Sequence, residues 1–193
     1  MNKTDFAFLS LAFRQKYIRR WSLMRSTSEE NLAEHSSQVA LIAHALALIG
    51  NRFFGKHYSP DRAALLALFH DIPEVYTGDL PTPVKYATSD MRRHFADFEQ
   101  QAVSRLLSKV PEELQDDYSS LFSDDEPEGE LVHLADKLCA FIKCIDEINS
   151  GNREFTSAKA SIEQQLSCYD SKELAYFLEH CLPAFSRTLD EIG

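Results

Sequence analysis

The sequence predicts an all-α fold, and three observations lead to it. Apolar residues recur at spacings of three and four along most of the chain, which is the period of an α-helix. The β-branched alternation that is typical of strands is nearly absent, and glycines number only 6 among 193 residues. Hydrophobic residues make up 44% of the chain, enough to bury one core, so we expect residues 1–193 to form a single domain.

Two apolar stripes identify the helices that should form the core. One lies in an apolar run over residues 39–50 and consists of Val39, Ile42, Leu46 and Ile49. The other lies in a helix that should begin at Pro127 and end at Gly151. Its members are Leu131, Leu134, Leu138, Phe141, Ile145 and Ile148.

The remaining elements follow from caps and helix breakers. Ser59 followed by Pro60 opens a helix that should run to His70. Periodic segments predict further helices over residues 4–18, 90–109, 112–121, 154–166, 172–181 and 183–192. Residues 78–83 hold a glycine and two prolines, so we expect a loop there.

The charge of the chain limits its partners. It carries 30 acidic and 20 basic residues, a formal net charge of −10. Ten of the carboxylates lie within residues 112–136, a stretch without Lys or Arg that we interpret as mostly solvated helix surface. A non-specific nucleic-acid binder neutralises phosphates with a basic surface, and so does a protein that docks on anionic membranes. We therefore expect neither a nucleic-acid polymer nor a membrane as partner.

A cytoplasmic location is the expectation from three further features. The apolar run over residues 39–50 is shorter than the roughly 20 residues that span a bilayer, so it should be a buried helix. The apolar run over residues 6–13 lacks the small-residue cleavage site of a signal peptide. The four cysteines show no Cys-x-x-Cys spacing and no match to a small disulfide scaffold, so we expect reduced thiols.

Two histidines and two aspartates offer a metal site. His35 faces the same side as the core stripe that follows it, the pair His70-Asp71 stands at a helix end, and Asp136 interrupts an apolar helix. A single buried histidine is more often a hydrogen-bonded core residue, but a carboxylate buried without a partner is costly and a cation would offset that cost. Imidazole and carboxylate groups suit a divalent first-row metal. These four side chains can hold one ion if three helices cross at one point.

Four segments of the chain carry a wider pattern. They are Asn31-Leu32-Ala33-Glu34-His35-Ser36, His70-Asp71-Ile72-Pro73-Glu74, Thr77-Gly78-Asp79-Leu80-Pro81-Thr82-Pro83-Val84-Lys85 and Ala135-Asp136-Lys137-Leu138-Cys139-Ala140. The order His, then His-Asp, then Asp resembles the HD-domain phosphohydrolases, and the loop after His-Asp resembles more closely the bacterial 5′-deoxynucleotidases of that superfamily. The resemblance implies an all-helical homodimer that hydrolyses deoxyribonucleoside 5′-monophosphates to nucleoside and phosphate. It also implies activation by one divalent metal such as cobalt or manganese.

The resemblance extends to the residues around the metal. Glu74 would orient the attacking water, and Asp79 would protonate the departing 5′ oxygen. Arg20 would grip the phosphate as a further catalytic group, Trp21 would cover the sugar or base, and the pair would help to exclude ribonucleotides. The implied substrate contacts are Arg20, Trp21, His35, Asp71, Thr77, Gly78, Asp79, Leu80 and Asp136. The metal and catalytic core would occupy about residues 20–150.

Other interpretations stay open on the sequence alone. Trp21 could fill the core where the first helix ends, Glu74 could be a surface carboxylate, and Asp79 could cap a turn. Lys85 is more simply a solvated loop lysine than a phosphate ligand. The alternative enzyme is an HD hydrolase of another phosphorylated nucleotide, such as a deoxynucleoside triphosphate or an alarmone. The non-enzymatic alternative is a helical scaffold with a structural metal.

Overall fold

The structure is a computed structural model that describes residues 6–81, 85, 88–123 and 125–193. These residues form helices, turns and loops, and none of them belongs to a strand. One isolated antiparallel bridge joins Arg19 to Asn31 across the loop that precedes the helix Leu32–Phe54. The prediction of an all-α fold is confirmed.

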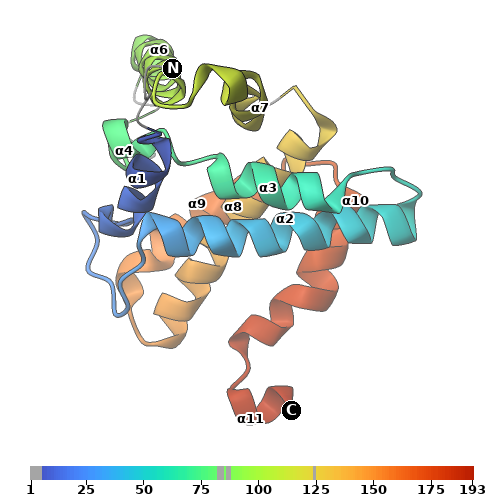
Figure 1. Cartoon of the computed structure of the whole chain (residues 1–193). Helices are drawn as coiled ribbons and strands as arrows, with labels where there is room; N and C mark the ends of the chain where they lie inside the picture. Colours follow the sequence, from blue (N-terminus) through green and yellow to red (C-terminus); the bar gives the residue numbers. More distant parts are fainter. Residues whose placement is uncertain (1–5, 82–84, 86–87, 124) are drawn as a thin grey trace.

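Three helices form the centre of the molecule. α2 (Leu32–Phe54) and α3 (Pro60–Phe69) run side by side, and α8 (Pro127–Asn149) packs against both (Figure 1). α9 (Thr156–Leu166) covers α8, and α10 (Lys172–Tyr176) covers α2. The predicted stripe of α2 is buried throughout, and that of α8 is buried from Leu131 to Phe141. The two stripes therefore meet in one core, as their spacing predicts.

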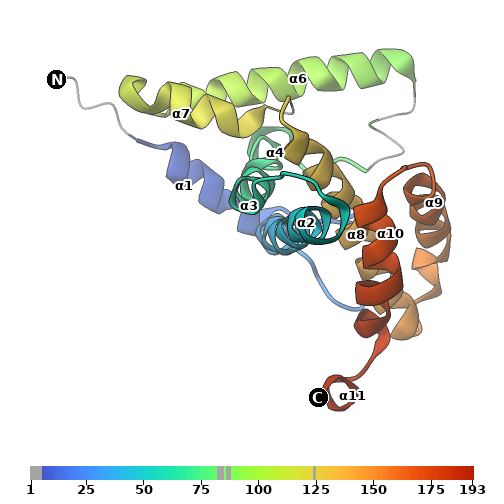
Figure 2. The same ribbon diagram turned by 90° about the vertical axis from the view of Figure 1, so that its right-hand side faces the viewer.

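A smaller apolar cluster supports the segment that follows His70. It consists of Phe8, Ile72, Leu106 and Val110, all nearly or fully buried. These residues join α1 (Phe8–Ala12) and the turn before α4 (Glu74–Thr77) to the end of α6 (Ser89–Leu107). α6 and α7 (Gln115–Ser119) lie together at one end of the molecule, and α11 (Leu189–Ile192) lies at the opposite end (Figures 1 and 2).

Capping residues explain why α2 is longer than its apolar run. Asn31 accepts hydrogen bonds from the backbone N–H groups of Ala33 and Glu34, and the Glu34 side chain accepts one from the N–H of Asn31. This reciprocal capping box starts the helix seven residues before the predicted run. Gly55, with φ of 67°, ends it in the left-handed conformation that glycine adopts without strain. His35 consequently lies in the first turn of α2.

The full length of α2 corrects one expectation about membranes. By length and composition alone, its 23 residues are long and apolar enough to span a bilayer, so the argument from a twelve-residue run is wrong. Half of the most apolar stretch is nevertheless buried inside the protein against α3 and α8. The core helices of soluble proteins pass the same test, and the prediction that this run is a buried helix is confirmed.

Several other predicted helices are shorter or broken. The helix over residues 4–18 is α1 followed by a 3₁₀ turn (Phe13–Tyr17), and residues 4–5 lie outside the described part. The helix over residues 112–121 consists of α7 between two single 3₁₀ turns. Residues 172–192 divide into α10, a π-helical turn (Phe177–Cys181), a 3₁₀ turn (Leu182–Ser186) and α11. A 3₁₀ turn also brings residues i and i+3 to one side, so an apolar repeat over a few residues does not distinguish it from an α-helix.

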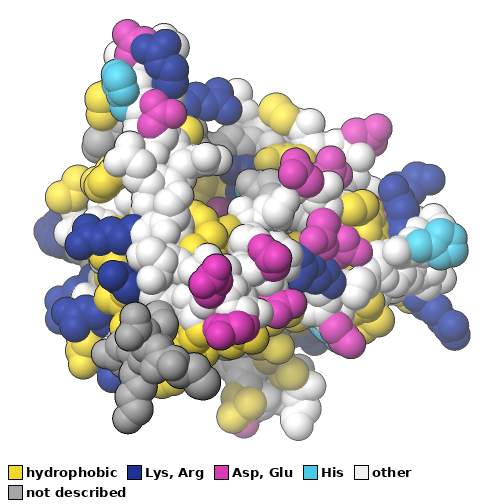
Figure 3. Space-filling model, turned by 45° about the horizontal axis from the view of Figure 1, so that its top comes forward, with side chains coloured by type: hydrophobic (Ala, Val, Ile, Leu, Met, Phe, Trp, Pro, Cys, Tyr) yellow, Lys and Arg dark blue, Asp and Glu magenta, His cyan; other side chains and the backbone are white. Residues whose placement is uncertain are grey.

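The acidic stretch is only partly solvated. Exposed Asp and Glu side chains do gather on the side of the molecule that carries α6 and α7 (Figure 3), and Glu112, Glu113, Asp116 and Asp117 are exposed. Glu126, however, binds the guanidinium of Arg62 through both oxygens, at 2.6 and 2.8 Å. Glu128 is buried and accepts the N–H of Ser59 at 2.6 Å. These two carboxylates tie the start of α8 to the start of α3.

Candidate active site

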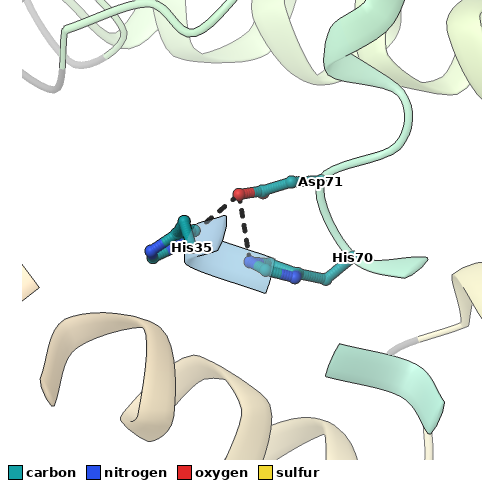
Figure 4. Close-up of side chains that lie close together, drawn as sticks. All are labelled: His35, His70 and Asp71. Atoms are coloured by element: carbon teal, nitrogen blue, oxygen red, sulfur yellow. Dashed lines mark ion pairs between the residues drawn. The ribbon is translucent and has the colours of Figure 1, made fainter. Parts of the chain in front are cut away.

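The four predicted metal ligands come from three helices that meet at one point. His35 lies on the first turn of α2, His70 at the end of α3 with Asp71 directly after it, and Asp136 in the middle of α8. Asp71 Oδ2 lies 3.1 Å from Nε2 of His70 and 3.6 Å from Nε2 of His35 (Figure 4). Asp136 Oδ1 lies 3.0 Å from Nε2 of His35. Side chains separated by up to 101 residues thus converge as the sequence predicts.

The hydrogen-bond partner of Nδ1 determines the tautomer of each of the two histidines, and so whether Nε2 carries a lone pair. Nδ1 of His70 lies 2.6 Å from the carbonyl oxygen of Ala67, and Nδ1 of His35 lies 3.3 Å from Oε1 of Glu30. An oxygen at Nδ1 favours the tautomer with hydrogen on that atom, which leaves the Nε2 lone pair free to bind a cation. Both Nε2 atoms face carboxylate oxygens, and such an arrangement is stable only with a proton or a metal ion between them.

This donor set fits a divalent cation. Nε2 of His70 is buried and has no hydrogen-bond partner, although a carboxylate oxygen lies close to it. Carboxylates also outnumber side-chain cations among the described residues here: Glu30, Asp71, Glu74, Asp79 and Asp136 surround Arg20 and Lys85. The ligand atoms of His35, His70 and Asp71 all lie within 4.8 Å of one another. Asp136 stands outside this trio and is joined to it through His35.

The pKa values follow from the crowding of these charges. Burial, the largest single influence, would lower the pKa of His70, but the charge and hydrogen bond of Asp71 and the charge of Asp136 together outweigh it and raise the pKa to about 9. Burial would raise the pKa of Asp136, but the hydrogen bond from His35 and the charge of Arg20 hold the pKa below its ordinary range. The centre therefore keeps Asp71 and Asp136 ionised and stabilises positive charge beside them.

Arg20 and Trp21 lie beside this centre on the loop before α2. The guanidinium of Arg20 is 12% exposed, with Nη1 3.7 Å from Asp71 Oδ2 and Nη2 3.9 Å from Asp136 Oδ1. Trp21 is half-buried: its ring packs on that of Phe155, with 5.2 Å between centroids, and its indole N–H donates to Glu30 at 2.8 Å. The sequence-adjacent pair is thus placed at the site, while its predicted role toward phosphate and sugar stays a prediction.

Glu74 follows Asp71 on the same continuous turn. Its N–H donates to the carbonyl of Asp71 at 3.0 Å, and its side chain is 6% exposed. Burial first, and the charge of Asp71 second, raise the pKa of Glu74 to about 7. Lys85 Nζ donates to Glu74 Oε1 at 2.9 Å with a side chain only 18% exposed. The interpretations of Glu74 as a surface carboxylate and of Lys85 as a solvated lysine are therefore wrong.

The end of α4 and the loop after it hold the remaining predicted residues, of which Asp79 interacts electrostatically with Arg20 and Asp71. Thr77, Gly78, Asp79 and Leu80 are all half-buried, and Gly78 ends α4 with φ of 72°. Burial raises the pKa of Asp79, while the positive charges of Arg20 and Lys85 act in the opposite direction. Residues 82–84 of the predicted loop lie outside the described residues. The substrate and proton-transfer roles assigned to this loop stay predictions.

Sequence reasoning missed Glu30 as part of the site and interpreted Lys85 as a solvated lysine. Glu30 stands beside exposed Glu29 in a polar segment, and no periodic pattern distinguishes the buried glutamate from the exposed one. Two surface cavities of about 540 and 250 Å³ lie elsewhere, the larger around Arg25 and Asn152 and the smaller around Tyr58 and Glu173.

Solved structures of HD-domain phosphohydrolases share the fold of this chain. An HD-domain phosphohydrolase from Listeria innocua superposes with a TM-score of 0.82 and 26% identity, over 92% of this chain and 87% of that one. A cyanophage S-2L HD phosphohydrolase, bound to dA and one catalytic Zn²⁺ ion, superposes with a TM-score of 0.62. At 19% identity over 91% of this chain and 96% of that one, the latter shows the shared fold alone.

Sequence comparison gives the family. A 5′-deoxynucleotidase of Vibrio cholerae is 46% identical over the whole length of both chains. The 5′-deoxynucleotidase YfbR of Escherichia coli O127:H6 is 48% identical over 97% of this chain and 94% of its own. The family model described as 5′-deoxynucleotidase YfbR-like matches residues 7–185. With this match across nearly its entire length, the chain belongs to the YfbR-like 5′-deoxynucleotidase family of HD-domain phosphohydrolases.

Proposed function

We propose that this protein hydrolyses deoxyribonucleoside 5′-monophosphates to deoxyribonucleoside and phosphate with one divalent cation held by His35, His70, Asp71 and Asp136. The observation that carries the proposal is the position of Asp71 Oδ2 between Nε2 of both histidines, at 3.1 and 3.6 Å, in a chain of a 5′-deoxynucleotidase family. Two imidazoles and two carboxylates are a donor set for a first-row metal. When bound, such a cation supplies a Lewis acid and a bound water of lowered pKa.

The protein's own side chains supply the proton transfers. Glu74 has a buried oxygen, Oε2, that is free of hydrogen bonds, and its raised pKa suits a group that accepts a proton from water near neutral pH. The water oxygen then forms a bond to phosphorus while the bond from phosphorus to the 5′ oxygen breaks. Asp79, whose pKa burial raises, donates the proton that the departing 5′ oxygen needs.

Arg20 and Trp21 position the substrate in this proposal. The guanidinium of Arg20 stands beside Asp71 and Asp136, so an anion bound at the centre meets a cation with two parallel donors. The half-buried ring of Trp21, fixed by Glu30 and Phe155, offers an apolar wall to the sugar. A 2′-hydroxyl against that wall would lose its hydrogen bonds to water, which disfavours ribonucleotides by about 1–3 kcal/mol. Thr77, Gly78 and Leu80 would complete the substrate contacts.

The remaining expectations are parts of the same proposal. Cobalt or manganese is the expected metal, the cytoplasm the expected compartment, and mononucleotides rather than nucleic-acid polymers the expected partners. A homodimer is supported by Leu41 and Leu48, which lie seven residues apart on one face of α2 and are 72% and 48% exposed. Light scattering coupled to size-exclusion chromatography tests the homodimer, which should have twice the 22.0 kDa mass of a monomer.

A substrate panel run against a metal panel tests the function. The purified protein, stripped of metal and reloaded with cobalt, manganese or zinc, is assayed for phosphate release from deoxy- and ribonucleoside 5′-monophosphates. We expect release from the deoxy substrates that depends on added metal and exceeds release from ribonucleotides by roughly tenfold or more. Equal rates on both sugars would remove the deoxy preference. Release of pyrophosphate or triphosphate from larger nucleotides would instead identify another HD hydrolase.

A further inference from the structure

Glu30 is a buried carboxylate that contacts three groups of the site at once. It is 8% exposed and lies at the end of the loop that precedes α2. Its Oε2 accepts the indole N–H of Trp21 at 2.8 Å, and its Oε1 lies 3.3 Å from Nδ1 of His35 and 3.6 Å from Nε of Arg20. One side chain thus stands between the two residues proposed to face substrate and one residue proposed to hold the metal.

The backbone around Glu30 shows that these contacts hold a conformation that the chain does not adopt freely. Trp21 has φ of 57°, the one positive value among the described residues other than glycine, and a bulky residue is strained in that backbone conformation. The N–H of Arg20 donates to the carbonyl of Glu30 at 3.0 Å, which closes the loop immediately beside the strained residue. The ring of Trp21 is therefore held by two contacts, the hydrogen bond to Glu30 at its nitrogen and the tilted packing against the ring of Phe155.

The contacts of Glu30 Oε1 do not favour stability alone. Oε1 of Glu30, Nε of Arg20 and Nδ1 of His35 are all buried and lack well-formed hydrogen bonds, although they face one another. Such atoms are costly to bury, and apolar side chains would fill the same space at lower cost. Their arrangement does fix the tautomer of His35, because a carboxylate beside Nδ1 keeps the proton there and leaves Nε2 for a cation.

The loop also has a separate anchor, so Glu30 is not needed to keep it closed. Thirteen residues lie between Arg19 and Asn31 inclusive, and their middle is held by Glu147 of α8, which accepts the N–H groups of Thr27 and Ser28. Loss of the Glu30 carboxylate should therefore release Trp21, Arg20 and His35 locally while the loop stays attached to α8.

From these contacts we infer that Glu30 is a positioning residue that couples the substrate-facing pair Arg20-Trp21 to the metal-facing histidine His35. The inference rests on the proposed function for the roles of those three residues. It assigns to Glu30 no contact with substrate or metal. Its consequence is that a single neutral substitution weakens metal binding and loosens Trp21 together.

Glu30→Gln tests this inference, with Glu29→Gln as the matched control. Glu29 is the preceding residue, its side chain is 71% exposed, and it pairs only with similarly exposed Arg19 in the described contacts. Trp21 is the single tryptophan of the chain, so protein fluorescence excited at the indole reports this residue alone. Metal affinity of the stripped protein is measured by calorimetric titration with manganese, and the exposure of Trp21 by acrylamide quenching in the absence of metal.

We expect Glu30→Gln to bind manganese about 10- to 100-fold more weakly and to be quenched more steeply, with Glu29→Gln equal to the unsubstituted protein in both measurements. Circular dichroism establishes that the variant is folded; if it is not, Glu30→Asp takes its place, with the charge kept and the reach shortened. Unchanged metal affinity and unchanged quenching in the folded variant would overturn the inference. If both change while the unsubstituted protein fails to hydrolyse deoxynucleotides, the positioning role stands and the proposed function fails.

Discussion

Glu147 should contribute more to stability than any exposed ion pair of this protein. Its carboxylate on α8 is 0% exposed and accepts hydrogen bonds from the N–H and hydroxyl of Thr27, the N–H of Ser28, the amide of Asn152 and the ammonium of Lys143. Lys143 is itself buried, and without Glu147 its ammonium would keep the carbonyl and hydroxyl of Ser28 and the ring of Phe155 but no carboxylate among its described contacts. The substitution Glu147→Ala therefore leaves a buried cation and several donors without their acceptor.

The size of the effect follows from that arrangement. Removal of one partner from a buried, hydrogen-bonded ion pair destabilises a protein by about 3–5 kcal/mol. In a chain of this length each kcal/mol lowers the melting temperature by roughly 2–4 °C. We therefore expect Glu147→Ala to melt about 6–20 °C below the unsubstituted protein at pH 7. The control is Glu154→Ala, because Glu154 binds Arg25 of the same loop but in an exposed pair that water screens.

The pH dependence gives a second test of the same residue. Burial would raise the pKa of Glu147, but the hydrogen bonds from Lys143, Thr27 and Asn152 hold it well below the ordinary value of 4.5. A carboxylate with a lowered pKa stabilises the fold above its unfolded pKa and loses that contribution as pH falls toward its folded pKa. Thermal melts by circular dichroism at pH 7 and pH 3 should show a smaller difference between the two proteins in acid. A loss of less than about 2 °C at pH 7 would refute this account of the loop anchor.

Two further predictions concern the site. Arg20→Ala should raise the KM for deoxynucleotides by roughly 10- to 100-fold, because it removes a charged hydrogen-bond donor worth about 1.5–3 kcal/mol. Elemental analysis should show that the variant retains the metal, and loss of the metal would contradict the assignment of Arg20 to phosphate. Because burial and Asp71 raise the pKa of Glu74 to about 7, kcat/KM should rise with pH and level off above that value. Glu74→Gln should lower kcat by about 10²-fold or more and abolish this acidic limb, whereas an unchanged pH profile would assign the proton transfer to another group.

The sequence was informative where a repeated pattern reports on burial. The stripes of α2 and α8 follow helical spacing over several turns, so the two core helices and the convergence of His35 and Asp136 could be anticipated. The start of α2 could also have been found, because Asn31 and Glu34 form a capping box three residues apart.

The features that were missed depend on tertiary contacts of single residues. Glu30 is buried and Glu29 is exposed because the loop closes between Arg19 and Asn31, and that closure has no signature in spacing. Lys85 is half-buried because its ammonium binds the carboxylate of Glu74, eleven residues earlier in the chain. Residue type and neighbours in sequence do not determine such pairings, so only the folded structure reveals them.

The Asp71→Ala variant tests the central claim most directly, because Asp71 Oδ2 faces both histidines. Phosphate release from a deoxyribonucleoside 5′-monophosphate is measured with the folded state followed by circular dichroism. The account predicts metal-dependent turnover in the unsubstituted protein and no turnover in the folded variant. Turnover that survives in Asp71→Ala would contradict the account and indicate a different catalytic centre. An unfolded Asp71→Ala variant, together with an unsubstituted protein that has no activity, would also contradict it and indicate a structural ion.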